Sequence, residues 1–309
     1  MKVFITGATG WIGSATTDAL LAAGHDVTAL ARSDRSAATI AAKGARVVRG
    51  SLDEPALLRS AAEEADAVVH LAYNHDWSDM AAAGATERRS IQTLGDALAG
   101  SGRALLFATG AFGIQTEGYA TEDQPSLAVG ENAPRGGGEN LALEYVERGV
   151  RVLPVRFAPT VHGTGDPNFI WTLSKIARRS GVAGYPGDGT NLWSAVHRSD
   201  AAEVIVRGLD RAPAGTRLHA VAEEAIPTRE IAEAIGRASN LPTAPIPADE
   251  FETHFGWIAG FFSADMATSS EATRRLLDWE PTGPTLFEDI AAGAYAPRED
   301  QAPGKASRA

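Results

Sequence analysis

The stretch that decides the fold is residues 1–14, MKVFITGATGWIGS. Its apolar residues 3–5 predict a short buried strand, and residues 14–23 carry apolar side chains at helical spacing. Three glycines with the spacing of a dinucleotide-binding motif separate the two elements: Gly7, Gly10 and Gly13. The first permits a tight turn, the second lets the backbone approach a pyrophosphate, and the third lets the helix pack closely on the strand. Backbone N–H groups at the helix start would then bind the phosphates.

This motif, a threonine followed by Gly-x-x-Gly-x-x-Gly, resembles that of the extended and atypical short-chain dehydrogenase/reductases, a family that includes nucleotide-sugar epimerases and dehydratases. The resemblance continues to about Pro284. It implies an α/β fold: a Rossmann-type doubly wound parallel sheet with a smaller C-terminal substrate-binding lobe. Within the motif it assigns six residues to the cofactor: Thr6, Gly7, Gly10, Trp11, Ile12 and Gly13.

The resemblance and the composition together predict the domain organisation. We expect an NADP-binding domain at 1–157 that also receives about 196–221. A partly interleaved substrate lobe is expected at 158–295, with residues 186–193 forming a turn-rich hairpin. Polar residues with Pro and Gly predict a flexible tail at 296–309.

Composition excludes several classes of function. The net charge of −11 argues against nucleic acid or an anionic membrane as partner. The chain has no cysteine, and His70 and His75 lack a third ligand at a recognisable spacing, so we expect no metal. No apolar run approaches the ~18–20 residues of a membrane span. Met1-Lys2 leads directly into a strand, so we expect a cytoplasmic protein without a signal peptide.

The end of the second predicted strand, 25–32, bears on the choice of cofactor. NAD-preferring members of such folds carry an acidic residue there, which binds the ribose hydroxyls. Ala31 takes that position here, and Arg32-Ser33 follows. An arginine would pair with a 2′-phosphate, so NADP(H) is favoured over NAD(H), with Arg32 and Ser33 as cofactor residues. The alternative is that Arg32 is a solvated loop residue.

Two further strand ends resemble cofactor-lining segments of the family. The third predicted strand, 45–48, leads into Ser51 and Leu52, which correspond to the segment beside the adenine. The fourth, 65–72, is apolar throughout, as expected for a strand buried on both faces. It ends in Leu71 and Ala72, which the resemblance also assigns to the cofactor. Ligands bind at the carboxyl edge of such sheets, so the following Tyr73 and His75 are substrate candidates.

Residues 104–108 predict the fifth strand, which ends in Thr109. In the family a Ser/Thr hydroxyl at this point polarises the substrate oxygen. Aligned on the strand, Thr109 falls one place before that position, which Gly110 occupies. The resemblance therefore makes Thr109 a candidate for both catalysis and cofactor binding, and the nearby Phe112 a substrate candidate.

Residues 129–144, VGENAPRGGGENLALE, depart from the family pattern. The family has Tyr-x-x-x-Lys here, in which the tyrosine transfers a proton and the lysine lowers its pKa and holds the nicotinamide ribose. If Glu139 is the helix glutamate of the family, Arg135 takes the lysine position and Glu131 the tyrosine position. None of the five tyrosines is followed by lysine four places later. The Tyr-x-x-x-Lys dyad is absent.

This departure changes the expected chemistry. Arg135 can donate hydrogen bonds to ribose hydroxyls or to a developing oxyanion, but its pKa above ~12 prevents it from acting as a general acid. Glu131 is either a catalytic carboxyl raised in pKa by burial or a solvated loop residue. The proton must come from elsewhere: Tyr73, His162 or water. His162 follows the sixth predicted strand, 150–157, where the family has a tyrosine, and is either titratable near neutrality or a packing residue.

The candidates therefore form two groups. The candidate catalytic residues are Tyr73, Thr109, Glu131, Arg135 and His162. The candidate substrate residues are Tyr73, His75, Phe112, Phe169, Trp193 and His197.

Three hypotheses about function follow. The first is an NADP(H)-dependent oxidoreductase that reduces a small or medium carbonyl compound with a non-standard active site. The second is an NAD(P)-dependent epimerase or dehydratase of a sugar-like substrate, which the missing tyrosine disfavours. The third is a catalytically silent NADP(H)-sensing protein, which the missing dyad favours. Family members often dimerise through helices that correspond to 79–98 and 139–147, so a homodimer is expected.

Overall fold

The computed structural model of the chain divides into two compact units. The residues that it describes are 1–74, 79–111, 114 and 118–297. The first unit comprises Met1–Val161, Trp193–Ala225 and Met266–Gly283. The second comprises His162–Leu192, Ile226–Asp265 and Pro284–Ala309.

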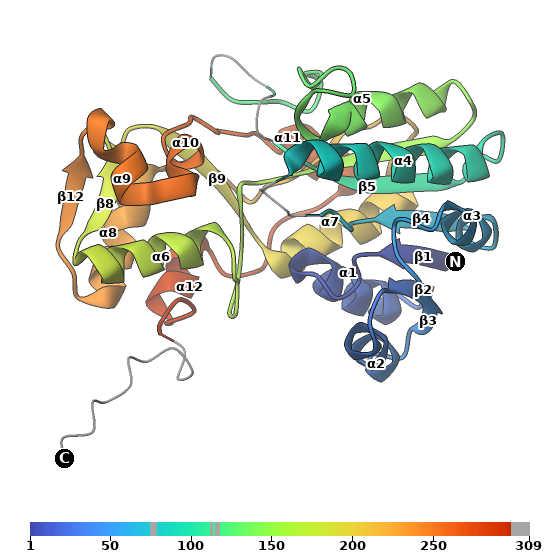
Figure 1. The fold of residues 1–309 in the computed structure, drawn as a ribbon, viewed down its shortest axis with the longest axis horizontal. Coiled ribbons are helices and arrows are strands. Elements are labelled where there is room, and N and C mark those ends of the chain that lie inside the picture. Colours follow the sequence, from blue (N-terminus) through green and yellow to red (C-terminus); the bar gives the residue numbers. More distant parts are fainter. Residues whose placement is uncertain (75–78, 112–113, 115–117, 298–309) are drawn as a thin grey trace. The chain divides into compact units, whose positions relative to one another are not determined.

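The first unit is built on a sheet of seven parallel strands (Figure 1). The strand order is β10-β6-β5-β4-β1-β2-β3. In chain order the strands are β1 Lys2–Thr6, β2 Asp26–Ala31, β3 Arg46–Arg49, β4 Ala67–His70, β5 Ala104–Gly110, β6 Arg151–Phe157 and β10 Leu218–Ala220. The chain winds outward from β1 to β3 and then returns to β4 on the other side of β1. The carboxyl ends of β1 and β4 therefore flank the topological switch point, where such sheets bind ligands.

Helices cover both faces of this sheet, as the doubly wound prediction requires. They are α1 Trp11–Ala22, α2 Asp34–Ala42, α3 Pro55–Glu63, α4 Met80–Leu98, α5 Gly138–Leu143, α7 Arg198–Arg211 and α11 Glu271–Leu277, with short 3₁₀ turns η1 Pro134–Gly137 and η2 Glu144–Val146. One apolar core joins the sheet to α1, α2, α7 and α11, and a second joins it to α3, α4 and α5. The predicted Rossmann-type α/β fold is confirmed.

Strand alternation decides which side chains share a face at the carboxyl edge. Thr6 is the register partner of His70, and His70 is the partner of Phe107. Phe107 belongs to the core formed with α4, so Thr6 and His70 face the same helix. Thr109, two residues beyond Phe107, continues this face.

A second, three-stranded sheet has the order β11-β9-β7. Its strands are β7 Thr160–His162, β9 Leu192–His197 and β11 Glu223–Pro227. The predicted hairpin at 186–193 is wrong: the strand before the turn, β8 Ala183–Pro186, pairs with β12 Thr243–Ile246, whereas β9 belongs to this other sheet.

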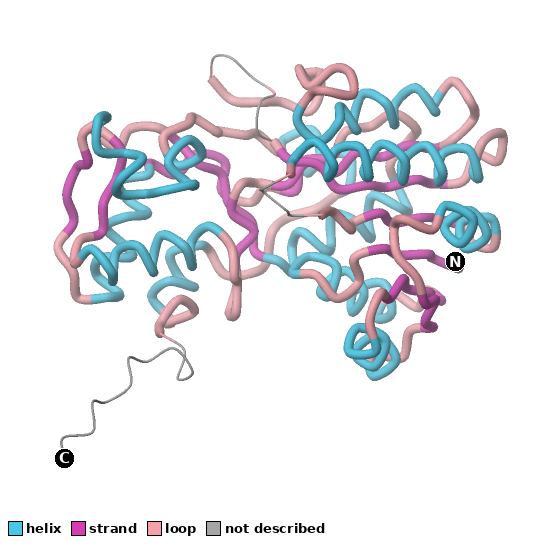
Figure 2. The backbone as a smooth tube through the Cα atoms, in the orientation of Figure 1, coloured by secondary structure: helices cyan, strands magenta, loops and turns pink. Residues whose placement is uncertain are grey.

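The second unit packs helices against the parallel pair β8 and β12 (Figure 2). These are α6 Phe169–Ser180, α8 Thr228–Ser239, α9 Phe251–Phe255, α10 Ala259–Phe262 and α12 Leu286–Ala291, with 3₁₀ turns η3 Ala248–Glu250 and η4 Gly256–Ile258. Both α6 and α8 pack on β8. Among the described residues, no helix combines the length and apolarity needed to cross a bilayer.

Candidate active site

The glycine loop between β1 and α1 brings three stretches of backbone into contact. Gly7 has φ +75°, and a Cβ there would lie 2.7 Å from the backbone nitrogen of Ala72. A Cβ on Gly13 would lie 2.0 Å from the carbonyl oxygen of Gly7. No other residue fits either position without moving the backbone. Gly10, the middle glycine of the motif, is the N-cap of α1.

The start of α1 fits the phosphates of a dinucleotide. Its N-cap makes no side-chain hydrogen bond, and the first turn carries no acidic residue. The first N–H groups of a helix have no intrahelical acceptor, and they lie at the positive end of its dipole. Trp11 and Ile12 begin this turn, and the Trp11 indole donates to the carbonyl oxygen of Val161 at 2.7 Å.

Thr6 and His70 link the loop to the end of β4. The Thr6 hydroxyl accepts from the backbone N–H of Ala72 at 3.2 Å and lies 2.7 Å from Nδ1 of His70. Burial, reinforced by the charge of Arg135, lowers the pKa of the His70 imidazole to about 4. The imidazole is therefore neutral at pH 7. Leu71 also contacts this point, because its N–H donates to the carbonyl oxygen of Thr6 at 3.2 Å.

The remaining predicted cofactor residues lie at the ends of β2 and β3, which are neighbours in the sheet. Arg32 is exposed and has no hydrogen bond or ion pair among the described residues. Ser33 caps α2 through a capping box with Ser36. Ser51 and Leu52 are half-buried, and the Ser51 hydroxyl accepts from the N–H of Asp53 at 3.2 Å.

Arg135 makes a bidentate ion pair with Glu87 at this edge. Its Nε donates to Oε2 of Glu87 at 3.1 Å, and its Nη2 donates to Oε1 at 2.9 Å. Its guanidinium carbon lies 4.4 Å from the ring centroid of Tyr73, a cation–π contact. Glu87 is 4% exposed, whereas the Arg135 side chain is 32% exposed.

A left-handed stretch of backbone carries Arg135 to this position. Arg135, Gly136 and Gly137 have φ of 53°, 61° and 63°. The stretch lies against α4, because a Cβ on Gly84 would come within 2.9 Å of the Gly136 nitrogen. Arg88 on the same helix donates from Nη1 to the Gly136 carbonyl oxygen at 2.7 Å.

Burial governs the titration of Glu87 and Tyr73. It raises the pKa of the Glu87 carboxyl, and the charge and hydrogen bonds of Arg135 oppose this effect. Burial also raises the pKa of the Tyr73 phenol, which Arg135 lowers and Glu87 raises. Tyr73 is therefore a neutral phenol at pH 7, able to donate a proton.

A buried ionic network lies beside Thr109. The register partner of Thr109 is Arg156, which is fully buried. Arg156 donates to both carboxylate oxygens of Glu139, one of which also accepts from Arg217 at 3.0 Å. Thr109 itself is half-buried. The network is saturated by protein groups and fixes α5 on the end of β6.

The other predicted site residues fall in different surroundings. Glu131 is exposed and makes no hydrogen bond or ion pair to Arg135. Trp193 is wholly buried in the first unit, and His197 is the N-cap of α7, with its Nδ1 2.7 Å from the Ser199 hydroxyl. His75 and Phe112 lie outside the described residues.

Two predicted residues belong to the second unit. His162 is fully buried, and its Nδ1 lies 2.6 Å from Oδ2 of Asp289. Phe169 opens α6, and its ring centroid lies 5.7 Å from that of Trp257 and 5.5 Å from that of Phe261.

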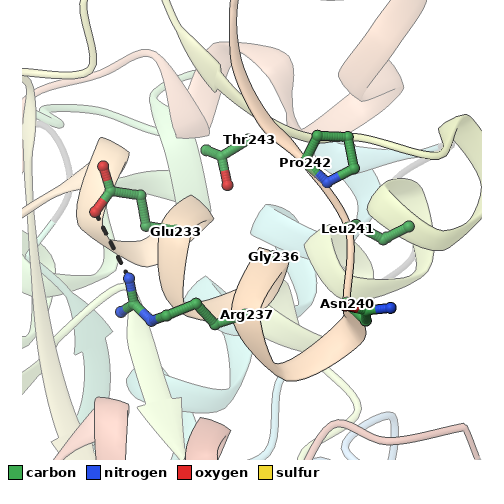
Figure 3. Close-up of a pocket in the computed structure, with 7 residues that line it drawn as sticks. All are labelled: Glu233, Gly236, Arg237, Asn240, Leu241, Pro242 and Thr243. Atoms are coloured by element: carbon green, nitrogen blue, oxygen red, sulfur yellow. Dashed lines mark ion pairs between the residues drawn. The ribbon is translucent and has the colours of Figure 1, made fainter.

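A surface cavity of about 560 Å³ in this unit lies at the end of α8 (Figure 3). None of the predicted site residues lines it.

Comparisons with known proteins identify the family of this chain. A model of the NAD-dependent epimerase/dehydratase family matches residues 3–124. An uncharacterized protein of Schizosaccharomyces pombe is 39% identical over 300 residues, 96% of this chain and 100% of its own length. The chain belongs to the NAD-dependent epimerase/dehydratase family. The family resemblance inferred from the sequence is confirmed.

Two further proteins are more distantly similar to this chain. A 3-diazoavenalumate denitrifying reductase of a Streptomyces species is 28% identical, covering 94% of this chain and 99% of its own. UDP-glucuronic acid 4-epimerase from Bacillus cereus, solved with a UDP-sugar and NAD, has a similar fold. Its TM-score is 0.73 at 17% identity, with 94% of this chain and 96% of that chain covered. The chain is thus of an NAD(P)-dependent oxidoreductase or epimerase type.

Sequence reasoning missed Glu87 and Arg88, which hold the Arg135 segment. The signal was present in α4. Its buried positions include Ala83, Glu87 and Ile91, so Glu87 falls on the apolar stripe of the helix. A carboxylate on such a stripe requires a partner. The identity of that partner, 48 residues away, was not local information.

Proposed function

We propose that the protein is an NADP(H)-dependent oxidoreductase that reduces a small or medium carbonyl compound at a non-standard active site. The observation that carries the proposal is the guanidinium of Arg135, 4.4 Å from the ring centroid of Tyr73 at the carboxyl end of the sheet. A cation beside a phenol reproduces the charge arrangement of the missing tyrosine–lysine dyad. Similarity to a reductase supports the direction of the reaction.

The cofactor is bound by the first unit in this proposal. The glycine loop and the first turn of α1 bind the pyrophosphate, and Arg32 pairs with the 2′-phosphate. NADP(H) is preferred over NAD(H) because Ala31 takes the position of the acid that would repel that phosphate, and Arg32 follows it. Arg135 has five N–H groups, of which Glu87 takes two, so three remain for the nicotinamide ribose or the substrate oxygen.

The chemistry assigned to the chain is positioning and proton donation. Bound NADPH supplies a hydride to the carbonyl carbon. Thr109 donates a hydrogen bond to the carbonyl oxygen, and Arg135 stabilises the negative charge that develops there. The phenol of Tyr73 donates the proton and recovers one from solvent. Tyr73 is preferred over Glu131 as donor because Glu131 is exposed and makes no bond to Arg135.

The second unit, His162–Leu192, Ile226–Asp265 and Pro284–Ala309, is assigned the substrate-binding role that was predicted for a lobe at 158–295. Its tilted aromatic cluster of Phe169, Trp257 and Phe261 favours an apolar substrate body. His162 remains a predicted catalytic residue, and its ring is oriented by Asp289. A cytoplasmic homodimer remains the expected assembly.

The test is spectrophotometric oxidation of NADPH with a panel of aldehydes and ketones. The wild-type protein is expected to turn over at least one of them. Tyr73→Phe and Arg135→Gln are each expected to lose at least about 100-fold in kcat, the scale of a lost proton donor or oxyanion contact. Leu127→Ala, an exposed change, serves as the control.

The other outcomes distinguish the alternatives. Interconversion of UDP-sugars without net NADPH oxidation would show an epimerase. Tight NADPH binding with no turnover of any carbonyl would show a silent cofactor sensor. Either result would overturn the proposed reductase.

A further inference from the structure

Resting on the proposed role of Arg135, we propose that Glu87 is a positioning residue for the active site. Its carboxylate fixes the guanidinium of Arg135 over Tyr73, so that Glu87, Arg135 and Tyr73 act together in place of the tyrosine–lysine dyad. A side chain of the long helix α4 thus supports a role that, in the family pattern, the tyrosine and lysine of one segment perform.

The contact has the geometry of a fixed pair. The two hydrogen bonds run from Nε and Nη2 to separate oxygens of one carboxylate, at 3.1 and 2.9 Å. Such a bidentate arrangement fixes the plane of the guanidinium as well as its position. Glu87 is nearly inaccessible to water at 4% exposure, so it has little freedom to move. The cation is therefore held in one orientation before any ligand binds.

The backbone on the arginine side is held just as firmly. Residues 135–137 adopt left-handed φ angles, which cost free energy at a non-glycine residue such as Arg135. Gly84 gives the segment room to lie on α4, and Arg88 bonds to its Gly136 carbonyl. Gly84, Glu87 and Arg88, within little more than one turn of α4, thus hold the segment that carries Arg135.

The charges around Arg135 show what Glu87 contributes. Glu87 compensates Arg135, so the buried face of the site carries no isolated charge. His70, whose pKa Arg135 lowers, is neutral and adds no charge. The far edge of the guanidinium keeps three N–H donors. With Arg135 32% exposed, this edge is open to a ligand.

The experiment removes the arginine side chain and supplies its head group in solution. Arg135→Gly suits the left-handed backbone, because glycine adopts φ +53° without strain. It leaves the Glu87 carboxylate facing a cavity of guanidinium shape. Calorimetric titration of Arg135→Gly with guanidinium chloride, at millimolar concentrations well below denaturing ones, then measures whether Glu87 holds the cation.

We expect guanidinium to bind Arg135→Gly and to restore turnover by at least about tenfold, as a repositioned oxyanion donor should. The double variant Arg135→Gly/Glu87→Gln is expected to bind no guanidinium and to show no restoration. Arg89→Ala is the matched control. Arg89 lies on α4, like Glu87, but it is exposed and its partner Asp53 is exposed too, so its removal leaves no buried carboxylate. This variant is expected to bind no guanidinium.

Equal binding or equal restoration in the double variant would overturn the role of Glu87, and so would the absence of binding to Arg135→Gly. If Arg135→Gly does not fold, Glu87→Gln alone decides. We expect it to lower kcat while the KM for NADPH changes less, and an unchanged kcat would contradict the proposal. Failure of the proposed function appears separately, as a wild-type protein that reduces no carbonyl while the calorimetric result stands.

Discussion

Two glycine-rich segments of the first unit differ in what their glycines do. In the loop from Gly7 to Gly13, the glycines let backbone lie directly against backbone at the start of α1. In the stretch from Arg135 to Gly138, close approach to α4 carries a side chain to its partner Glu87. In the proposed function the first segment binds the cofactor through backbone N–H groups, which nearly every residue has. The second depends on two particular side chains far apart in the sequence.

The difference teaches where function can be recognised. A backbone site is defined by spacing alone, so the glycine motif indicates it without knowledge of the rest of the chain. A side-chain site is defined by a contact between residues. The sequence around Arg135 therefore shows an arginine at the lysine position of the family pattern, but it does not show that Glu87 is its partner.

The largest expected effect comes from breaking the first segment. In Gly13→Ala the new Cβ would lie 2.0 Å from the Gly7 carbonyl oxygen, so the loop must move. We expect NADPH affinity to fall at least about 100-fold, roughly 3 kcal/mol of binding free energy. Calorimetric titration measures the loss. Gly260→Ala, where a Cβ meets nothing within 4 Å, is the control, and equal affinity of the two variants would contradict the account.

A second effect comes from the histidine attached to the first segment. The pKa of His70 is about 4 in the fold, below its ordinary value of about 6.5 in the unfolded chain. The unfolded state therefore binds more protons between these values, and stability is lost as pH falls from 6.5 towards 4. The contribution is on the order of 3 kcal/mol. Urea unfolding across this pH range should show a shallower dependence for His70→Gln, and parallel curves would refute the assignment.

Breaking the second segment should produce a smaller and different effect. In Gly84→Ala the new Cβ lies 2.9 Å from the Gly136 nitrogen, which pushes residues 135–137 off α4. The helix gains about 1 kcal/mol of propensity, so the protein should stay folded. We expect turnover to fall about tenfold, because Arg135 loses its alignment. A change in NADPH affinity as large as that of Gly13→Ala would erase the distinction between the segments.

The smallest expected effect comes from Glu131, which belongs to neither glycine-rich segment. Glu131 is exposed and makes no bond to Arg135, although it stands at the tyrosine position of the family pattern. Glu131→Gln should change the free energy of unfolding by less than about 0.5 kcal/mol, as is usual for exposed sites. Turnover should stay within twofold of the wild type. A large loss of turnover would restore Glu131 as a catalytic residue.

The sequence predicted the parts of the molecule that depend on local pattern. The strand, loop and helix of residues 1–22 follow from apolar spacing and three glycines. Helix α4 begins next to its N-cap Asp79, as the 79–98 prediction has it. The hairpin at 186–193 failed because strand pairing is not local. Residues 243–246, which lie among Pro242, Pro245 and Pro247, supply the true partner of β8.

The candidate site was predicted in the same uneven way. Thr6, Gly7, Leu71 and Ala72 meet because the carboxyl ends of β1 and β4 are adjacent, which the fold class already implies. Arg135 was identified by its distance from Glu139. Its contact with Tyr73 could not be derived, because it depends on a left-handed turn stabilised by α4.

The most direct test of the central claim is calorimetric titration of the wild-type protein and Arg32→Asp with NADPH and NADH. We expect tight binding of NADPH and at least about tenfold weaker binding of NADH, because a charge-assisted phosphate contact contributes about 1.5–3 kcal/mol. Arg32→Asp should remove most of that preference while still binding NADH. Failure of both nucleotides to bind the wild-type protein would contradict the account.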